Sequence, residues 1–211
     1  QPTGRYRDYY VKVATYVAIL SGPAQALDPS ATAMTHPVIE ATEEDDGVFN
    51  YVDTASSRAG IGAVTTRLEM GKVAIVGLGG TGSYVLDLVA KTPVRQIHLY
   101  DGDIFFQHNA FRCPGAPSAD ELKEKPNKAT HFRDVYSKMR RGIIAHECYV
   151  DCGNVEGLRS MDFVFLCLDR GSARRLIIPW LEEYGVPFVD VGMGLYLNGG
   201  ALGGLVRVTV S

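Results

Sequence analysis

Residues 73–82 read VAIVGLGGTG, a short apolar run that ends in a cluster of glycines. The run predicts a buried strand over 72–76, and the residues beyond it predict a helix over 80–91. Glycines between a strand and a helix let the backbone approach a phosphate, and the helix start offers N–H groups to the anion. The stretch therefore predicts a phosphate-binding turn. The candidate residues of this turn are Gly77, Gly79, Gly80 and Gly82.

Expected strands and helices alternate along the chain on both sides of this turn. Short apolar segments bounded by glycine or proline are typical of buried strands, and the segments between them have helical spacing. Strands joined by helices in this order form βαβ units. The sequence therefore predicts an α/β protein with a Rossmann-like three-layer fold and a mainly parallel sheet. Further strands are expected over 96–100, 143–150, 162–168, 186–191 and 201–210, and further helices from Ser56 or Ser57 to about 69 and over 125–140 and 171–184.

Residues 1–53 precede this pattern and are expected to be an N-terminal extension or the tail of another module. Helical spacing favours a helix over 8–21, and Pro23 is expected to break regular structure beyond it. The acidic run at 43–46 is expected to be an exposed loop. The sequence thus predicts two parts, 1–53 and 54–211.

Composition narrows the class of protein. The net charge is −3, so no basic field is present and no nucleic-acid partner is expected. No apolar run is long enough to cross a bilayer and no signal peptide is visible, which favours a cytoplasmic protein without a membrane partner. The four cysteines are expected to be free thiols rather than a zinc site, because Cys148 and Cys152 lack a second ligand pair nearby. The chain starts with Gln1, so a fragment and a processed form both stay open.

An acidic residue, Asp101, follows the second expected strand, 19 residues after Gly82. In nucleotide-binding sheets an acid at this place holds ribose hydroxyls. Up to this point an NAD-dependent oxidoreductase fits equally well. Residues 101–112 then read DGDIFFQHNAFR, which places Asn109 and Arg112 at a spacing that a dehydrogenase has no reason to carry. Arginine is a permanent cation whose planar donor fork suits phosphate oxygens.

Several segments in a fixed order carry a family resemblance. The segment DGDIFFQHNAFR is followed by KPNKA, CLDR and VDVGMG, and it is preceded by SRAGI and the glycine turn. This order, over roughly residues 55–210, resembles the ThiF/MoeB/HesA family of adenylyltransferases and the ubiquitin-activating enzymes. The resemblance implies an ATP-binding adenylyltransferase domain over 54–211, possibly short of its C-terminal part.

The resemblance also implies roles for single residues. Asn109 and Arg112 would reach the ATP phosphates, together with Lys128, for which Lys125 is the alternative. The acid of the CLDR segment, Asp169, would hold Mg²⁺, a role that suits a hard oxygen ligand at the carboxyl edge of a sheet. The remaining candidates are Asp101 and Asp103 at the nucleotide, and Arg58, which would enter the ATP site of the other copy in a homodimer.

The implied reaction is the ATP-dependent adenylation of a carboxylate with release of pyrophosphate. The expected partner is a ubiquitin-like or sulfur-carrier protein that presents its C-terminal glycine; a small molecule, a peptide or a modified tRNA stays open as substrate. The paired CxxC motifs of the family are absent, and no cysteine lies on the expected crossover loop, so the resemblance does not extend to thioester chemistry. A non-catalytic scaffold that binds ubiquitin-like proteins and an NAD-dependent oxidoreductase remain the alternatives.

Overall fold

The computed structural model describes residues 6–34, 38–39 and 47–211 of the chain. The chain divides into two compact units, Gln1–Ile39 and Glu40–Ser211. The acidic run at 43–46, expected to be an exposed loop, lies outside the described residues. The boundary expected between residues 53 and 54 stays a prediction.

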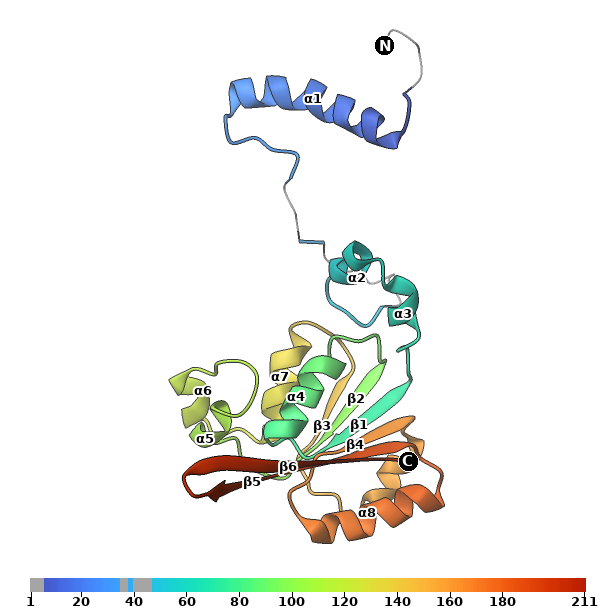
Figure 1. Ribbon diagram of the computed structural model, residues 1–211, viewed down its shortest axis with the longest axis vertical. Coiled ribbons are helices and arrows are strands. Elements are labelled where there is room, and N and C mark those ends of the chain that lie inside the picture. Colours follow the sequence, from blue (N-terminus) through green and yellow to red (C-terminus); the bar gives the residue numbers. More distant parts are fainter. Residues whose placement is uncertain (1–5, 35–37, 40–46) are drawn as a thin grey trace. The chain divides into compact units, whose positions relative to one another are not determined.

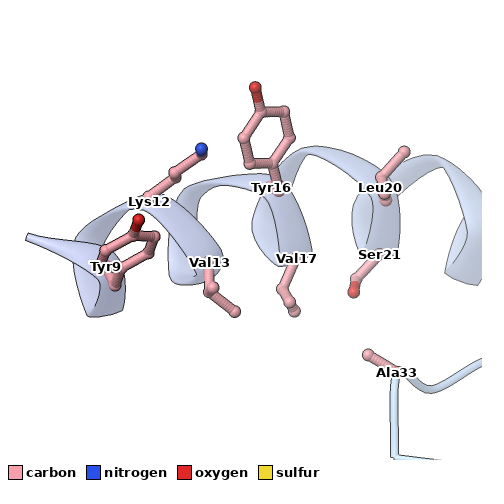
Figure 2. Close-up of a pocket in the computed structure, with 8 residues that line it drawn as sticks. All are labelled: Tyr9, Lys12, Val13, Tyr16, Val17, Leu20, Ser21 and Ala33. Carbon is pink, nitrogen blue, oxygen red and sulfur yellow. The ribbon is translucent and has the colours of Figure 1, made fainter. Parts of the chain in front are cut away.

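The first unit contains one long helix, α1 (Tyr9–Leu27), which begins at the N-cap Asp8. The expectation that regular structure breaks at Pro23 was wrong, because α1 continues through this proline. Proline removes one backbone donor, and here no residue of α1 is buried, so water can satisfy the carbonyl that is left without a partner. Figure 2 shows the apolar groove along α1, lined by Tyr9, Lys12, Val13, Tyr16, Val17, Leu20 and Ser21, together with Ala33.

The second unit is built on one six-stranded sheet (Figure 1). Its strands are β1 (Lys72–Val76), β2 (Gln96–Tyr100), β3 (Ile143–His146), β4 (Phe163–Leu166), β5 (Phe188–Asn198) and β6 (Ala201–Val210). They lie in the order β3-β2-β1-β4-β5-β6. The neighbours from β3 to β5 pair in parallel and β6 pairs with β5 antiparallel. The predicted α/β class with a mainly parallel sheet is confirmed.

Helices cover both faces of this sheet, which makes the three layers. On one face α4 (Gly80–Val89) and α7 (Lys128–Ser137) pack over β1 and β2, where Leu86 and Phe132 join Ile75 in the core. On the other face α8 (Gly171–Glu183) and the 3-10 helix η1 (Val155–Ser160) pack over β4, where Ile177 and Leu158 are fully buried. No helix in the described part of the chain is long and apolar enough to cross a membrane.

The single helix expected from Ser56 or Ser57 to about residue 69 is instead two short ones, α2 (Thr54–Ala59) and α3 (Gly62–Thr66). Gly60 ends α2 in the left-handed conformation, at φ 67°. The N-cap is Asp53, whose side chain accepts hydrogen bonds from the backbone N–H groups of the first turn. Aspartate and serine are about equally good N-caps, so the residue type alone does not choose between Asp53 and the serines that follow it.

The helix expected over 125–140 starts only at Lys128, because Pro126 and the N-cap Asn127 separate α7 from α6 (Ala119–Lys123). A further short helix, α5 (Gln107–Ala110), precedes α6. Strand β3 ends at His146 rather than at residue 150. Strand β5 runs beyond its expected end at 191, because its pairing with β6 continues to Asn198 and Ala201.

The β5–β6 hairpin exposes an apolar face beyond the part of β5 that pairs with β4. Met193, Leu195 and Leu197 alternate along β5, and their register places Leu202 and Val206 of β6 on the same face. All five side chains are largely exposed. Within residues 47–211 nothing covers this face.

Residues 48–50 contact the end of α7 and the start of the next turn. The backbone N–H of Asn50 donates to the carbonyl of Met139 at 2.9 Å, and the N–H of Arg141 donates to the carbonyl of Val48 at 2.8 Å. Between them, Phe49 forms an isolated antiparallel bridge with Arg140. This short segment is therefore attached to the sheet domain upstream of residue 54.

Arg140 is only 1% exposed. Its guanidinium donates to the carbonyls of Ala90, Thr92 and Val94, the segment that follows α4. Because these carbonyls lie past the last helical hydrogen bonds, the buried arginine satisfies acceptors that the helix end leaves open.

Candidate functional site

The candidate site lies at the carboxyl edge of the sheet, where β1 and β4 are neighbours. After β1 the chain adds β2 and β3 on one side, and β4 and β5 follow on the other, so the strand order reverses between β1 and β4. Ligands of open α/β sheets bind at such a switch point. The residues that follow β1, β2, β3 and β4 all meet at this edge.

The glycine turn after β1 combines glycines that the fold requires with glycines that leave open surface. A Cβ on Gly82 would lie 1.8 Å from the carbonyl oxygen of Gly77. Gly77 itself has φ 92°, and a Cβ there would lie 2.6 Å from the carbonyl oxygen of Cys167. A Cβ on Gly79, in contrast, would have no atom of the described chain within 4 Å. The backbone of Gly79 is therefore bare toward the outside of the turn.

The N-terminus of α4 is also open. Its N-cap is Gly79, which provides no side-chain hydrogen bond, and the first turn holds no acidic residue. The first N–H groups of a helix have no acceptor within the helix and carry the positive end of its dipole. A turn of this kind suits an anion such as a phosphate.

Asp101 braces this turn from the end of β2. One oxygen of its carboxylate accepts the N–H of Leu78 at 2.7 Å, and the other accepts the N–H of Asp103 at 2.9 Å. Burial raises the pKa of Asp101, while these two hydrogen bonds and the charge of Lys128 oppose the increase. Each oxygen can accept a further hydrogen bond, so the expected contact with a ribose stays a prediction.

Lys128 is the first residue of α7, and its side chain is buried against the two aspartates. Its Nζ lies 2.7 Å from Oδ2 of Asp103 and 3.8 Å from Oδ1 of Asp101. The hydrogen bond from Lys128, followed by one from Tyr149, lowers the pKa of Asp103. The alternative candidate, Lys125, is exposed in the turn before α7, at φ 50°. The structure thus brings Lys128, and not Lys125, to the two aspartates.

Asn109 and Arg112 lie on and just after α5, beside the start of α4. Asn109 is buried, and its Oδ1 accepts the N–H of Phe106 at 2.8 Å, which fixes the α5 turn. The carbonyl oxygen of Arg112 lies 3.4 Å from the position that a Cβ on Gly80 would take. The Arg112 side chain is exposed and has no hydrogen-bond or ion-pair partner among the described residues. The backbone of Arg112 therefore lies next to the glycine turn.

Asp169 follows β4 in the segment that faces β1. The N–H of Cys167 donates to the carbonyl of Val76 at 2.8 Å, so the two strand ends stay together up to this point. Asp169 is exposed, and its carboxylate has no partner among the described residues. Arg58 lies elsewhere: it is exposed on α2, upstream of β1 and at the opposite edge of the sheet (Figure 1). The structure does not bring Arg58 to the site of its own chain.

Sequence reasoning missed two groups at this edge. Tyr149, directly after β3, donates from its hydroxyl to Asp103, and the Arg170 guanidinium lies 5.5 Å from the centre of the Tyr149 ring. The sequence predicted a strand over 143–150, so Tyr149 was expected inside the sheet. Because β3 ends at His146, Tyr149 instead lies in a loop beside Asp101. The second group is the fully buried Asp190, which pairs with Arg174 of α8 at 2.7 Å and with Arg207 of β6 at 2.5 Å.

The residues present fit a nucleoside triphosphate with its magnesium ion. The bare Gly79 backbone and the open α4 N-terminus suit phosphate oxygens, and the buried cation Lys128 is linked to this turn through Asp101. No group of three or more His, Cys, Asp or Glu side chains within the described ranges could hold a metal ion by itself. Mg²⁺ commonly takes one or two carboxylates and completes its shell with phosphate oxygens and water, so a site with a single protein carboxylate is compatible with this ion.

Comparison with solved structures gives the same fold. E. coli MccB solved with MccA-N7isoASN is 18% identical, with a TM-score of 0.56 over 68% of this chain and 47% of MccB. E. coli tRNA N6-threonylcarbamoyladenosine dehydratase, TcdA, is 21% identical, with a TM-score of 0.55 over 68% of this chain and 60% of TcdA. E. coli MccB solved with ATP is 18% identical, with a TM-score of 0.55 over 70% of this chain and 42% of MccB. The chain thus spans about half the length of these proteins.

Comparison with protein families divides the sequence in two overlapping parts. Residues 1–54 match a domain of unknown function, DUF6791. Residues 33–203 match the ThiF family. No protein with curated annotation matches the sequence. Since the second match extends over most of the chain, and the sheet carries the glycine turn at its switch point, the chain belongs to the ThiF family.

Proposed function

We propose that the sheet domain binds Mg-ATP and adenylates a carboxylate, most concretely the C-terminal glycine of a ubiquitin-like or sulfur-carrier protein. The single observation that carries the proposal is the pairing of a bare turn with a buried cation. The Gly79 backbone is open, and Lys128 is linked to the same turn through Asp101, which accepts the Leu78 N–H. Membership of the ThiF family supports the reaction type.

In the proposed complex the glycine turn and the α4 N-terminus bind the phosphates, while Lys128, Arg112 and Asn109 surround them. Asp101 and Asp103 face the ribose. Asp169 holds the magnesium ion, which neutralises charge on the phosphates. Lys128 must leave part of its contact with Asp103 to reach a phosphate oxygen, and such an exchange of one anionic partner for another conserves its charge pairing.

The proposed reaction is the transfer of the adenylyl group of ATP to a carboxylate. A carboxylate oxygen of the substrate attacks the α-phosphorus of ATP, and the bond from that phosphorus to the bridging oxygen of the β-phosphate breaks. Pyrophosphate leaves with the electron pair, and a mixed anhydride of the carboxylate and AMP remains. The chain contributes position and positive charge rather than a proton transfer.

Two relatives bear on the substrate. MccB has been solved with ATP and with the peptide MccA, and a peptide is a carboxylate-bearing substrate class that suits the proposed reaction. TcdA is a tRNA-modifying enzyme by name, but the net charge of −3 disfavours a nucleic-acid partner for this chain. We extend the proposal to a cytoplasmic homodimer in which Arg58 of each copy enters the site of the other.

Nucleotide binding by the whole chain tests the first step. Lys128→Met should weaken Mg-ATP binding by about 10- to 100-fold in titration calorimetry, since a hydrogen bond to a charged group contributes about 1.5 to 3 kcal/mol. Lys123→Met is the matched control, because Lys123 forms an exposed pair with Asp120 at the same 2.7 Å distance. If the chain binds NAD but does not bind Mg-ATP, the oxidoreductase is favoured instead.

Exchange of labelled pyrophosphate into ATP tests the second step, with candidate ubiquitin-like proteins added. Asp169→Ala should abolish the exchange while nucleotide-free stability stays unchanged, because this carboxylate has no partner among the described residues. Normal exchange in Asp169→Ala contradicts its role as the metal ligand. Tight Mg-ATP binding with no exchange for any carboxylate favours the non-catalytic scaffold.

A further inference from the structure

Tyr149 lies at the carboxyl edge of the sheet, beside the candidate site, and has no role in the proposed reaction. It follows β3, and half of its side chain is exposed. Its ring lies against the backbone of Gly102: a Cβ on this glycine would come within 2.8 to 3.0 Å of three ring carbons. The glycine between Asp101 and Asp103 therefore makes room for the ring.

The Tyr149 hydroxyl and Lys128 share one carboxylate. Oδ1 of Asp103 accepts the hydrogen bond from Tyr149, and Oδ2 accepts from Nζ of Lys128 at 2.7 Å. The two donors come from different elements, the segment after β3 and the start of α7. Asp103 is half-exposed, so without the tyrosine little would fix the rotation of its carboxylate.

Contacts continue from Tyr149 toward β4. The guanidinium of Arg170, the residue after Asp169, lies 5.5 Å from the ring centre. The ring is thus held by Gly102, by Asp103 and by a cation–π contact. These contacts link the residues after β2, β3 and β4 to Lys128.

We propose that Tyr149 is a positioning residue that acts through Asp103 on Lys128 and keeps this lysine available to the polyphosphate of the nucleotide. This inference rests on the proposed function, in which Lys128 binds phosphate. Donation from the hydroxyl draws negative charge from Asp103 and holds one of its oxygens away from the lysine. Without that donation both oxygens are free to pair with Lys128, and a phosphate must compete with a stronger partner.

The test uses the whole chain and magnesium tripolyphosphate, a probe without base or ribose, in titration calorimetry. Tyr149→Phe removes only the hydroxyl, and it should weaken binding by about 3- to 10-fold, in line with the loss of one hydrogen bond of roughly 1 kcal/mol. Tyr184→Phe is the matched control: its ring also lies under a guanidinium, that of Arg159 at 4.7 Å, and its hydroxyl has no partner in the described chain.

A double-mutant cycle separates positioning from a general structural role. In an Asp103→Asn background, Tyr149→Phe should cause no further loss of affinity. Where Asp103→Asn binds too weakly to measure, Gly102→Ala replaces it. A Cβ at residue 102 displaces the ring, so Gly102→Ala should weaken binding as Tyr149→Phe does, and the two together should weaken it no further.

The outcomes distinguish the inference from the proposed function. Equal binding by Tyr149→Phe and the wild type, with a loss in Lys128→Met, overturns the role of Tyr149 and leaves the proposed function standing. An undiminished effect of Tyr149→Phe in the Asp103→Asn background also overturns it. Unchanged binding in Lys128→Met overturns the proposed function itself.

Discussion

Gly82→Ala should destabilise the sheet domain even when no nucleotide is present. Its Cβ would lie 1.8 Å from the Gly77 carbonyl oxygen and 3.2 Å from the Cβ of Cys167. The first distance is about 1.5 Å short of an ordinary carbon–oxygen contact of about 3.3 Å. The new Cβ and the Gly77 carbonyl both belong to the same tight backbone turn, so no side-chain rotation relieves their overlap. Overpacking typically costs about 1 to 3 kcal/mol and occasionally more. Because this overlap is with a backbone atom and is about 1.5 Å deep, we expect a cost above that range, about 3 to 5 kcal/mol. The gain in helix propensity from glycine to alanine offsets about 1 kcal/mol.

The net loss of about 2 to 4 kcal/mol is a large part of the free energy of unfolding of a domain, which is about 5 to 15 kcal/mol. Urea unfolding followed by Trp180 fluorescence measures it. Trp180 is the only tryptophan of the chain and lies on α8, so it reports on the sheet domain. With an m-value of about 2 kcal/mol per molar, the midpoint should fall by about 1 to 2 M.

Gly79→Ala is the matched comparison within the same turn. Gly79 has extended backbone geometry, and a Cβ there meets no atom within 4 Å. The free energy of unfolding of Gly79→Ala should be lower than that of the wild type by less than about 1 kcal/mol, the difference between glycine and alanine at an N-cap. Its Mg-ATP affinity should fall by about 10-fold or more, because the new methyl group occupies the surface proposed for the phosphates. Equal unfolding midpoints for Gly82→Ala and Gly79→Ala would refute this division of roles.

Three further predictions concern buried groups outside the turn. Arg140→Lys should lower the unfolding free energy by about 2 to 4 kcal/mol in urea, because the single nitrogen of an ammonium cannot reproduce the planar set of N–H groups with which the guanidinium reaches the carbonyls of Ala90, Thr92, Val94 and Arg141; a loss under 1 kcal/mol would contradict this. Burial lowers the pKa of His98 to about 4. Between about pH 6.5 and 4 this imidazole is protonated in the unfolded chain but not in the folded chain. The free energy of unfolding should therefore fall as the pH drops through this range. For this partly buried ring the effect is about 1 to 2 kcal/mol after solvent screening. The difference between the urea midpoints at pH 7 and 4.5 should therefore be smaller in His98→Gln. Burial raises the pKa of the Cys167 thiol to about 12, so at pH 8 iodoacetamide should alkylate it far more slowly than the exposed Cys152; comparable rates in peptide mass spectra would show that Cys167 is accessible.

Local patterns predicted three of the strands with their bounds. The strands expected over 72–76, 96–100 and 201–210 have these same bounds in the structure. Patterns failed where one residue changes the backbone direction. Gly60 looks like any glycine inside a helical pattern, and only its left-handed φ shows that it ends α2. The apolar Tyr149 and Val150 extended the expected third strand into a loop.

The candidate site could be predicted as a set of residues, but not as a set of contacts. The place after the second expected strand indicated Asp101, and the family resemblance of the KPNKA segment indicated Lys128; the structure places their side chains together. That Asp101 accepts the N–H of Leu78 depends on the pairing of β1 with β2, which no local pattern contains. The contact of Tyr149 with Asp103 depends in the same way on β2 and β3 being neighbours. The roles assigned to all candidate site residues, Asn109 and Asp169 among them, stay predictions.

The attachment of residues 48–50 beside Arg140 decides where the chain can be shortened. A protein that begins at Thr54 would lose the Val48 carbonyl opposite the Arg141 N–H and the Asn50 N–H opposite the Met139 carbonyl. It would also lack the Phe49 ring, whose centre lies 5.9 Å from the guanidinium carbon of Arg140. Expression of the sheet domain alone should therefore start no later than Gly47, whose carbonyl also accepts a hydrogen bond from Arg141.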